Sequence, residues 1–185
     1  MDNLIIIIEI VFPAIAIGAI AFLTISKYIH FEETRQKLAI DKSQLEIVVP
    51  LRLQAYERII LFLERTQPEN LVRRVLKSDF TARSFQAELV STVRSEYEHN
   101  LSQQIYISLP AWSMVKTATE ETIRLVNVAG TKVQGNSPAT DLAGKILEIT
   151  SQIGKFPTSM AIENIKKEFA QYFLLATQPK LEDEK

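Results

Sequence analysis

The chain has 185 residues, which is enough for one domain with a hydrophobic core and an additional segment. Its net charge of −1 lacks the basic excess typical of nucleic-acid-binding proteins, and the absence of cysteine excludes disulfides, thiolate zinc sites and thiol catalysis. With only five glycines and seven prolines, the composition favours helices over sheets.

The first predicted element is the apolar stretch 4–26, "LIIIIEIVFPAIAIGAIAFLTIS", with one charged residue in 23 positions. About 20 apolar residues are enough for a helix to cross the hydrocarbon core of a bilayer. A cleaved signal peptide would carry a positive charge before a shorter apolar run, yet Asp2 is the only charged side chain ahead of Glu9. We therefore expect a retained transmembrane anchor within residues 1–30.

The charges on the two sides of this stretch predict its orientation. No basic residue precedes the stretch, whereas four follow it: Lys27, Arg35, Lys37 and Lys42. Because basic residues are enriched on the cytoplasmic side of membrane spans, we expect the N-terminus outside and the C-terminal domain in the cytoplasm. Residues 31–49 are charged and are expected to continue as a juxtamembrane helix until Pro50.

Glu9 is the one ionisable residue within the apolar stretch. An ionisable group at membrane depth is by default a functional candidate, such as an intramembrane contact with a partner or a proton site. Alternatively the apolar core begins at Ile10, so that Glu9 lies at the outer interface and Pro13 falls in the first turns of the helix. Both interpretations remain open on the sequence.

The rest of the chain shows apolar residues at helical spacing, interrupted by proline, glycine and polar turns. The predicted helices cover residues 51–66, 68–78, 81–109, 110–129, 138–153 and 157–176. No alternating run of β-branched residues indicates a strand. The sequence thus predicts an all-α protein: an N-terminal transmembrane helix, then a bundle of about five or six helices at 50–176, then a flexible acidic tail at 177–185.

No catalytic or metal-binding motif is found in the sequence. Glu96 and His99 have the Glu-x-x-His spacing of carboxylate-bridged di-iron bundles, but such a site needs two of these pairs. The only other histidine, His30, has Lys27 three residues before it. Neither histidine lies near a nucleophile motif such as G-x-S-x-G. We therefore expect no metal, no cofactor and no enzymatic activity.

Two amides fall on the apolar face of a predicted helix, and they are the main site candidates. Asn100 and Gln104 lie within the same arc as four apolar residues, which are Leu89, Val93, Tyr97 and Leu101. Arg52 lies among apolar residues on an earlier helix. An internal network joining Arg52 with Glu96, Asn100 or Gln104 would satisfy these groups. Alternatively this face is a groove that receives a partner's helix, or the amides reach water.

The segments "PLRLQAYERIILFLERTQP" (50–68) and "EYEHNLSQQIYIS" (96–108), followed by Trp112, resemble an uncharacterised bacterial family. Its members, mainly from Bacteroidota, are small single-pass membrane proteins with a helical domain of unknown function. The resemblance covers most of the chain after residue 48 and implies the inner membrane of a Gram-negative bacterium. It implies no activity, ligand or catalytic residue.

Three functions remain as hypotheses. The first is a membrane-anchored interaction or scaffold protein that contacts membrane lipid and either a protein partner or a second copy of itself, but no nucleic acid. The second is a small-molecule or lipid-binding bundle with a cavity between the helices of Tyr97 and Trp112. The third is a membrane enzyme with Glu9 or Glu96 as acid or base.

Overall fold

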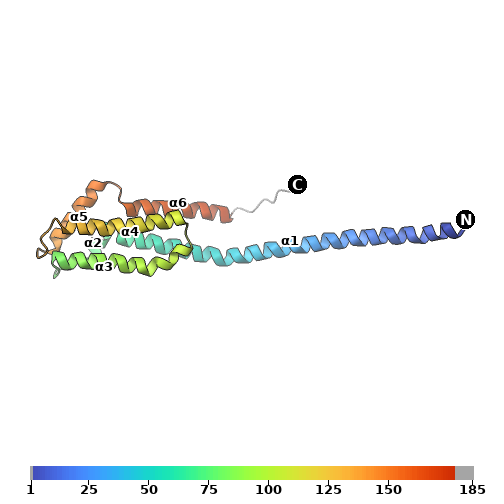
Figure 1. The fold of residues 1–185 in the computed structure, drawn as a ribbon, viewed down its shortest axis with the longest axis horizontal. Helices are drawn as coiled ribbons and strands as arrows, with labels where there is room; N and C mark the ends of the chain where they lie inside the picture. Colours follow the sequence, from blue (N-terminus) through green and yellow to red (C-terminus); the bar gives the residue numbers. More distant parts are fainter. Residues whose placement is uncertain (1, 178–185) are drawn as a thin grey trace. The chain divides into compact units, whose positions relative to one another are not determined.

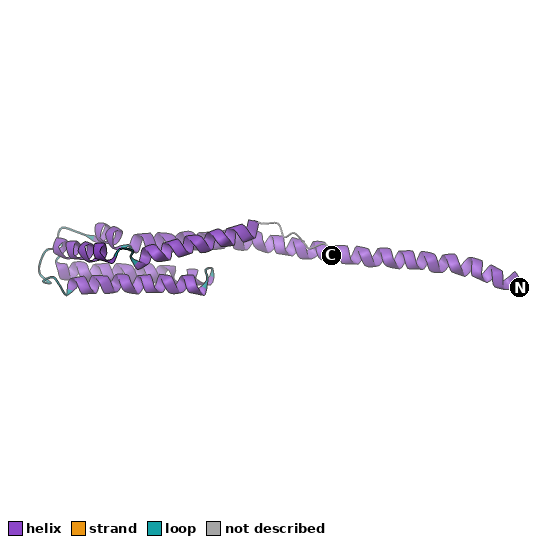
Figure 2. Ribbon diagram, turned by 90° about the horizontal axis from the view of Figure 1, so that it is seen from above, coloured by secondary structure: helices purple, strands orange, loops and turns teal. Residues whose placement is uncertain are grey.

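The structure is a computed structural model that describes the backbone of residues 2–177 and the side chains of residues 15, 17, 18, 20–32, 35 and 46–174. The described residues form seven helices and no strand, which confirms the all-α prediction (Figures 1 and 2). The helices are α1 (Asp2–Thr66), α2 (Pro68–Val75), α3 (Ala82–Asn100), the 3-10 helix η1 (Leu101–Ile105), α4 (Leu109–Gly130), α5 (Ala139–Ile153) and α6 (Pro157–Thr177).

The chain divides into two compact units, residues 1–48 and residues 49–185. In the first unit, large apolar side chains of α1 are 58–71% exposed: Ile15, Ile17, Ile20, Phe22, Leu23 and Ile25. Judged on the described residues alone, no helix combines the length and the apolar character needed to cross a membrane. The side chain of Glu9 lies outside the described residues.

Two predicted helix ends are wrong. Helix α1 continues through Pro50 to Thr66, although proline lacks the N–H that would bond the carbonyl of Glu46. The strong apolar face of residues 55–63 packs into the core and outweighs this loss. The helix predicted to run from residue 81 to 109 ends at Asn100 instead. There the side-chain Nδ2 of Asn100 donates to the Glu96 carbonyl at 2.8 Å and competes with the helical backbone.

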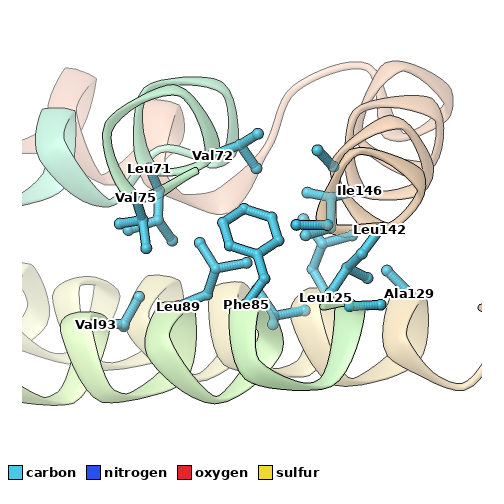
Figure 3. Close-up of a cluster of buried hydrophobic side chains, with 14 of the residues drawn as sticks. Leu71, Val72, Val75, Phe85, Leu89, Val93, Leu125, Ala129, Leu142 and Ile146 are labelled. Atoms are coloured by element: carbon cyan, nitrogen blue, oxygen red, sulfur yellow. The ribbon is translucent and has the colours of Figure 1, made fainter. Parts of the chain in front are cut away.

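The second unit contains two hydrophobic clusters that share α4. The first cluster lies between α2, α3, α5 and the C-terminal half of α4, with the Phe85 ring at the centre of the view in Figure 3. The second lies between α1, α6 and the N-terminal half of α4. Its fully buried members include Tyr56, Ile59 and Phe62. Helix α4 packs against both α3 and α6 because it carries a buried stripe along its whole length.

Side-chain caps fix where α3 and α4 begin. Thr81 and Ser84 form a reciprocal capping box at the start of α3. Ser108 caps α4, where its Oγ accepts a hydrogen bond from the Ala111 N–H at 3.2 Å. Ser137, whose type and place before Pro138 would suit a helix cap, does not cap α5, because α5 begins at Ala139 and the Ser137 Oγ donates to the Gln134 carbonyl at 2.7 Å. The Ser137 side chain therefore stabilises the turn that precedes α5.

Candidate functional site

Arg52 connects three segments of the second unit. Its Nε donates to the Tyr106 carbonyl at 2.9 Å, in the connection between η1 and α4. Its guanidinium carbon lies 3.9 Å from the centre of the Tyr172 ring on α6. At that distance the cation and the π face attract each other, and partial burial strengthens the attraction. Arg52 thus holds α1 against both α6 and the segment that precedes α4.

Beside Arg52, the carboxylate of Glu168 receives three hydrogen bonds. Its Oε1 accepts from the Tyr56 hydroxyl at 2.7 Å and from the Ser108 N–H at 3.0 Å. Its Oε2 accepts from the Ser108 hydroxyl. Because Ser108 is the N-cap of α4, the carboxylate also lies at the partly positive end of that helix. We call the six residues Arg52, Tyr56, Tyr106, Ser108, Glu168 and Tyr172 the Glu168 cluster.

The surroundings of Glu168 favour its ionised form. Burial by itself raises the pKa of Glu168, but hydrogen bonds from Ser108 and Tyr56 and the charge of Arg52 outweigh this effect. The net result is a pKa below the ordinary value. Burial, with the hydrogen bond to Glu168 and its charge, raises the pKa of Tyr56 to about 12. The cluster is therefore an anionic carboxylate held by neutral hydroxyls and one cation.

The chemistry of the Glu168 cluster points to positioning of helices. A serine beside a carboxylate lacks the imidazole that activates the hydroxyl in Ser-His-Asp sites. The carboxylate oxygens already accept hydrogen bonds from the protein itself. Within the described residues, no group of three or more potential metal ligands is present. The contacts instead join α1, α4 and α6 at one end of the second hydrophobic cluster.

Glu96 belongs to a different set of contacts. Its Oε1 lies 2.7 Å from Arg65 Nη2 and 3.2 Å from Arg74 Nη1, so that it joins α3 to the end of α1 and to α2. His99, one turn further along α3, is exposed. The suggested network of Arg52 with Glu96 is therefore replaced by two separate groups, because the two residues bind different partners.

The two amides, Asn100 and Gln104, also lie in different surroundings. Asn100 is buried, as the helical spacing indicated, but its side chain donates to the Glu96 carbonyl of its own helix. Gln104 is exposed, and Gln103 is buried in its place. The α-helix gives way to 3-10 geometry at residue 101, and each 3-10 residue advances about 120° instead of 100° around the axis. The prediction assumed a continuous α-helix and therefore placed Gln104 in the interior, where the structure has Gln103.

The sequence analysis missed Glu168, although a signal was present. Glu168 lies between Ile165 and Phe169, which are three residues before it and one after it on the apolar face of α6. A carboxylate at such a position predicts a buried polar partner. Its partners could not be named, since Tyr56 and Ser108 are 112 and 60 residues away in the chain.

The fold and the site define an all-α helical domain whose polar residues hold helices together. Residues 2–172 match a family of unknown function, DUF7935, and the chain belongs to this family. The expected membership of an uncharacterised family is thereby confirmed, whereas the bacterial group and the single-pass character stay predictions. No curated protein and no solved structure matches the chain.

Proposed function

We propose that the protein is a single-pass protein of a bacterial inner membrane whose cytoplasmic helical domain acts as an interaction or scaffold module. The observation that carries the proposal is the exposed apolar helix of the first unit. Six large aliphatic and aromatic side chains between residues 15 and 25 are each more than half exposed. A helix that is apolar on all sides requires apolar surroundings, which a bilayer supplies.

The composition of the flanking sequence supports the proposed orientation. Tyr28 and Phe31 follow the apolar stretch and are 67% and 60% exposed, as expected for rings at a membrane interface. Basic residues follow the stretch and none precedes it. The helical domain is therefore proposed to lie in the cytoplasm.

The contacts of the helical domain favour an interaction role over a ligand carrier. The rings of Tyr97 and Trp112 stack with their centres 5.6 Å apart and their planes 23° apart. They fill part of the space between α3 and α4, and the hollow that remains there, lined by Tyr97, Lys116 and Ile123 among others, has a volume of about 180 Å³, which is small for a ligand site. The Glu168 cluster likewise uses its polar groups on contacts within the domain.

Reporter fusions test the orientation. We expect alkaline phosphatase fused after residue 185 to be inactive, and a green fluorescent protein at the same site to fluoresce. Active phosphatase on a membrane-bound fusion would reverse the proposed topology.

Crosslinking in intact membranes, followed by purification of the full chain, tests the interaction role. The matched control is residues 1–48 fused to a fluorescent protein, which keeps the proposed anchor and removes the helical domain. We expect a specific crosslinked protein with the full chain that is absent from the control. Identical products from the two proteins would contradict an interaction role for the domain.

A further inference from the structure

Helix α1 carries a regular row of exposed residues on the surface of the second unit. Five of them follow one another at alternating steps of three and four: Leu51, Gln54, Arg58, Leu61 and Arg65. In the sequence the same spacing reaches back to Ile47. The aliphatic members are 41–63% exposed, and none of the row belongs to the two hydrophobic clusters. Alternating steps of three and four are typical of the face along which one helix pairs with another, and we call the five residues the α1 seam.

Two opposite charges at the seam lack a partner within the domain. Glu57 and Arg58 are both exposed, and no ion pair joins either of them to another residue whose side chain the structure describes. The residues three and four positions away from each of them on α1 are all uncharged, and adjacent residues of a helix do not face each other. Arg65 differs, because it is already paired with Glu96. The charges of Glu57 and Arg58 are therefore available to a second molecule.

The arrangement of these two charges matches a second copy of the same helix. At 3.6 residues per turn, Glu57 and Arg58 point about 100° apart, toward opposite flanks of the seam. A two-fold axis that runs along two parallel copies of α1 brings the opposite flanks together, so that each Glu57 lies beside the partner's Arg58. The contact then occurs twice, as symmetry requires of a dimer. An antiparallel pair would bring flanks of the same charge together.

We propose that the α1 seam is the interface of a parallel homodimer, in which Leu51 and Leu61 pack against their counterparts and Glu57 pairs with the partner's Arg58. The inference rests on the proposed anchor, because chains held in one membrane meet at a high effective concentration. The seam alone is weak, since exposed ion pairs contribute little and polar residues at core positions lower the stability of a coiled coil. The same polar residues make the pairing specific for register and partner.

Cysteine crosslinking of the full chain in isolated membranes tests the pairing. The chain has no cysteine, so Gln54→Cys or Leu61→Cys places a single thiol on the seam. A disulfide requires two Cα atoms within about 7 Å of each other, which facing positions of paired helices satisfy. We expect mild oxidation to give a disulfide-linked dimer with either variant. The matched control is Leu53→Cys, which is 40% exposed and adjacent to Gln54 but points away from the seam, and it should crosslink about tenfold less.

Charge reversal then tests the proposed ion pairs. Arg58→Glu places a carboxylate beside the partner's Glu57 and should lower the crosslinked fraction of Gln54→Cys about fivefold. Adding Glu57→Arg exchanges the two charges and should restore the crosslinking. Lys167→Glu, on the exposed surface of α6, is the control reversal and should leave it unchanged. Because the seam lies outside the core, these variants should change the pairing and leave the stability of the domain nearly unchanged, which circular dichroism checks.

The outcomes separate the pairing from the anchor. Membrane-bound protein that crosslinks equally at residues 53 and 54, not at all at 54 and 61, or only to a different protein would overturn the homodimer and leave the anchor intact. A double reversal that fails to restore crosslinking would overturn it as well. Protein recovered outside the membrane would contradict the anchor. Crosslinks at residues 54 and 61 would then still support the pairing, and their absence would overturn it.

Discussion

The two hydrophobic clusters of the second unit are built in different ways. The first, around Phe85, consists of aliphatic and aromatic side chains from α2, α3, α4 and α5. The second is equally apolar inside, yet the Glu168 cluster lies at one end of it. We therefore expect packing to dominate the stability of the first cluster, whereas the ionisation of a single part-buried carboxylate also contributes to the stability of the second.

The largest expected effect comes from the apolar cluster. Phe85→Ala removes a fully buried ring and should lower the free energy of unfolding by about 3–5 kcal/mol, with the same loss at pH 7 and pH 4. Chemical unfolding followed by circular dichroism measures it. Leu61→Ala, at a position that is 57% exposed, is the control and should cost far less. Equal losses for the two variants would show that Phe85 is not part of a packed core.

The second largest effect tests the carboxylate. Glu168→Gln keeps the shape but weakens bonds to Ser108 and Tyr56, and should cost about 1–3 kcal/mol at pH 7. Because the pKa of Glu168 in the folded state lies below its ordinary value of 4.5, its contribution is present above pH 4.5 and is lost as the pH falls further. The difference between wild type and variant should therefore shrink in acid. Glu57→Gln, at an exposed position, is the control. If the difference in unfolding free energy between wild type and Glu168→Gln did not change with pH, this account would be contradicted.

A smaller effect is expected at alkaline pH from Tyr56. Tyr56→Phe should cost about 1 kcal/mol near neutral pH by removing the hydrogen bond to Glu168. Because the pKa of Tyr56 is raised from 10.0 to about 12, wild type should lose stability between these pH values, since only the unfolded chain ionises readily. The variant lacks this loss, so the difference in the free energy of unfolding between wild type and variant should narrow as the pH rises. In a Glu168→Gln background this narrowing should be weaker. A free-energy difference that stays the same from pH 7 to pH 12 would argue against a raised pKa for Tyr56.

The smallest effect is expected at the other carboxylate. Glu96 pairs with Arg65 and Arg74 across partly exposed surfaces, where water and salt screen the charges. Glu96→Gln should therefore cost less than about 1 kcal/mol, and the cost should fall as salt is added. Unfolding curves at two salt concentrations provide the measurement. A loss as large as that of Glu168→Gln would remove the contrast between the two carboxylates.

The sequence predicted the helices well and the polar contacts poorly. Helical spacing located α2, α4, α5 and α6, because burial of one face repeats with the period of the helix. It failed at Asn100, where a side chain competes for a backbone carbonyl and the α-helix gives way to 3-10 geometry. It also failed for Glu168, since contacts between residues 60 and 112 positions apart depend on how helices pack.

The most direct test of the central proposal is the behaviour of the full chain in membranes treated with alkaline carbonate. We predict that the protein stays in the membrane pellet and that its N-terminal sequence retains residues 4–26. Release of the protein into the supernatant, or a mature chain that begins after residue 26, would contradict the proposed anchor.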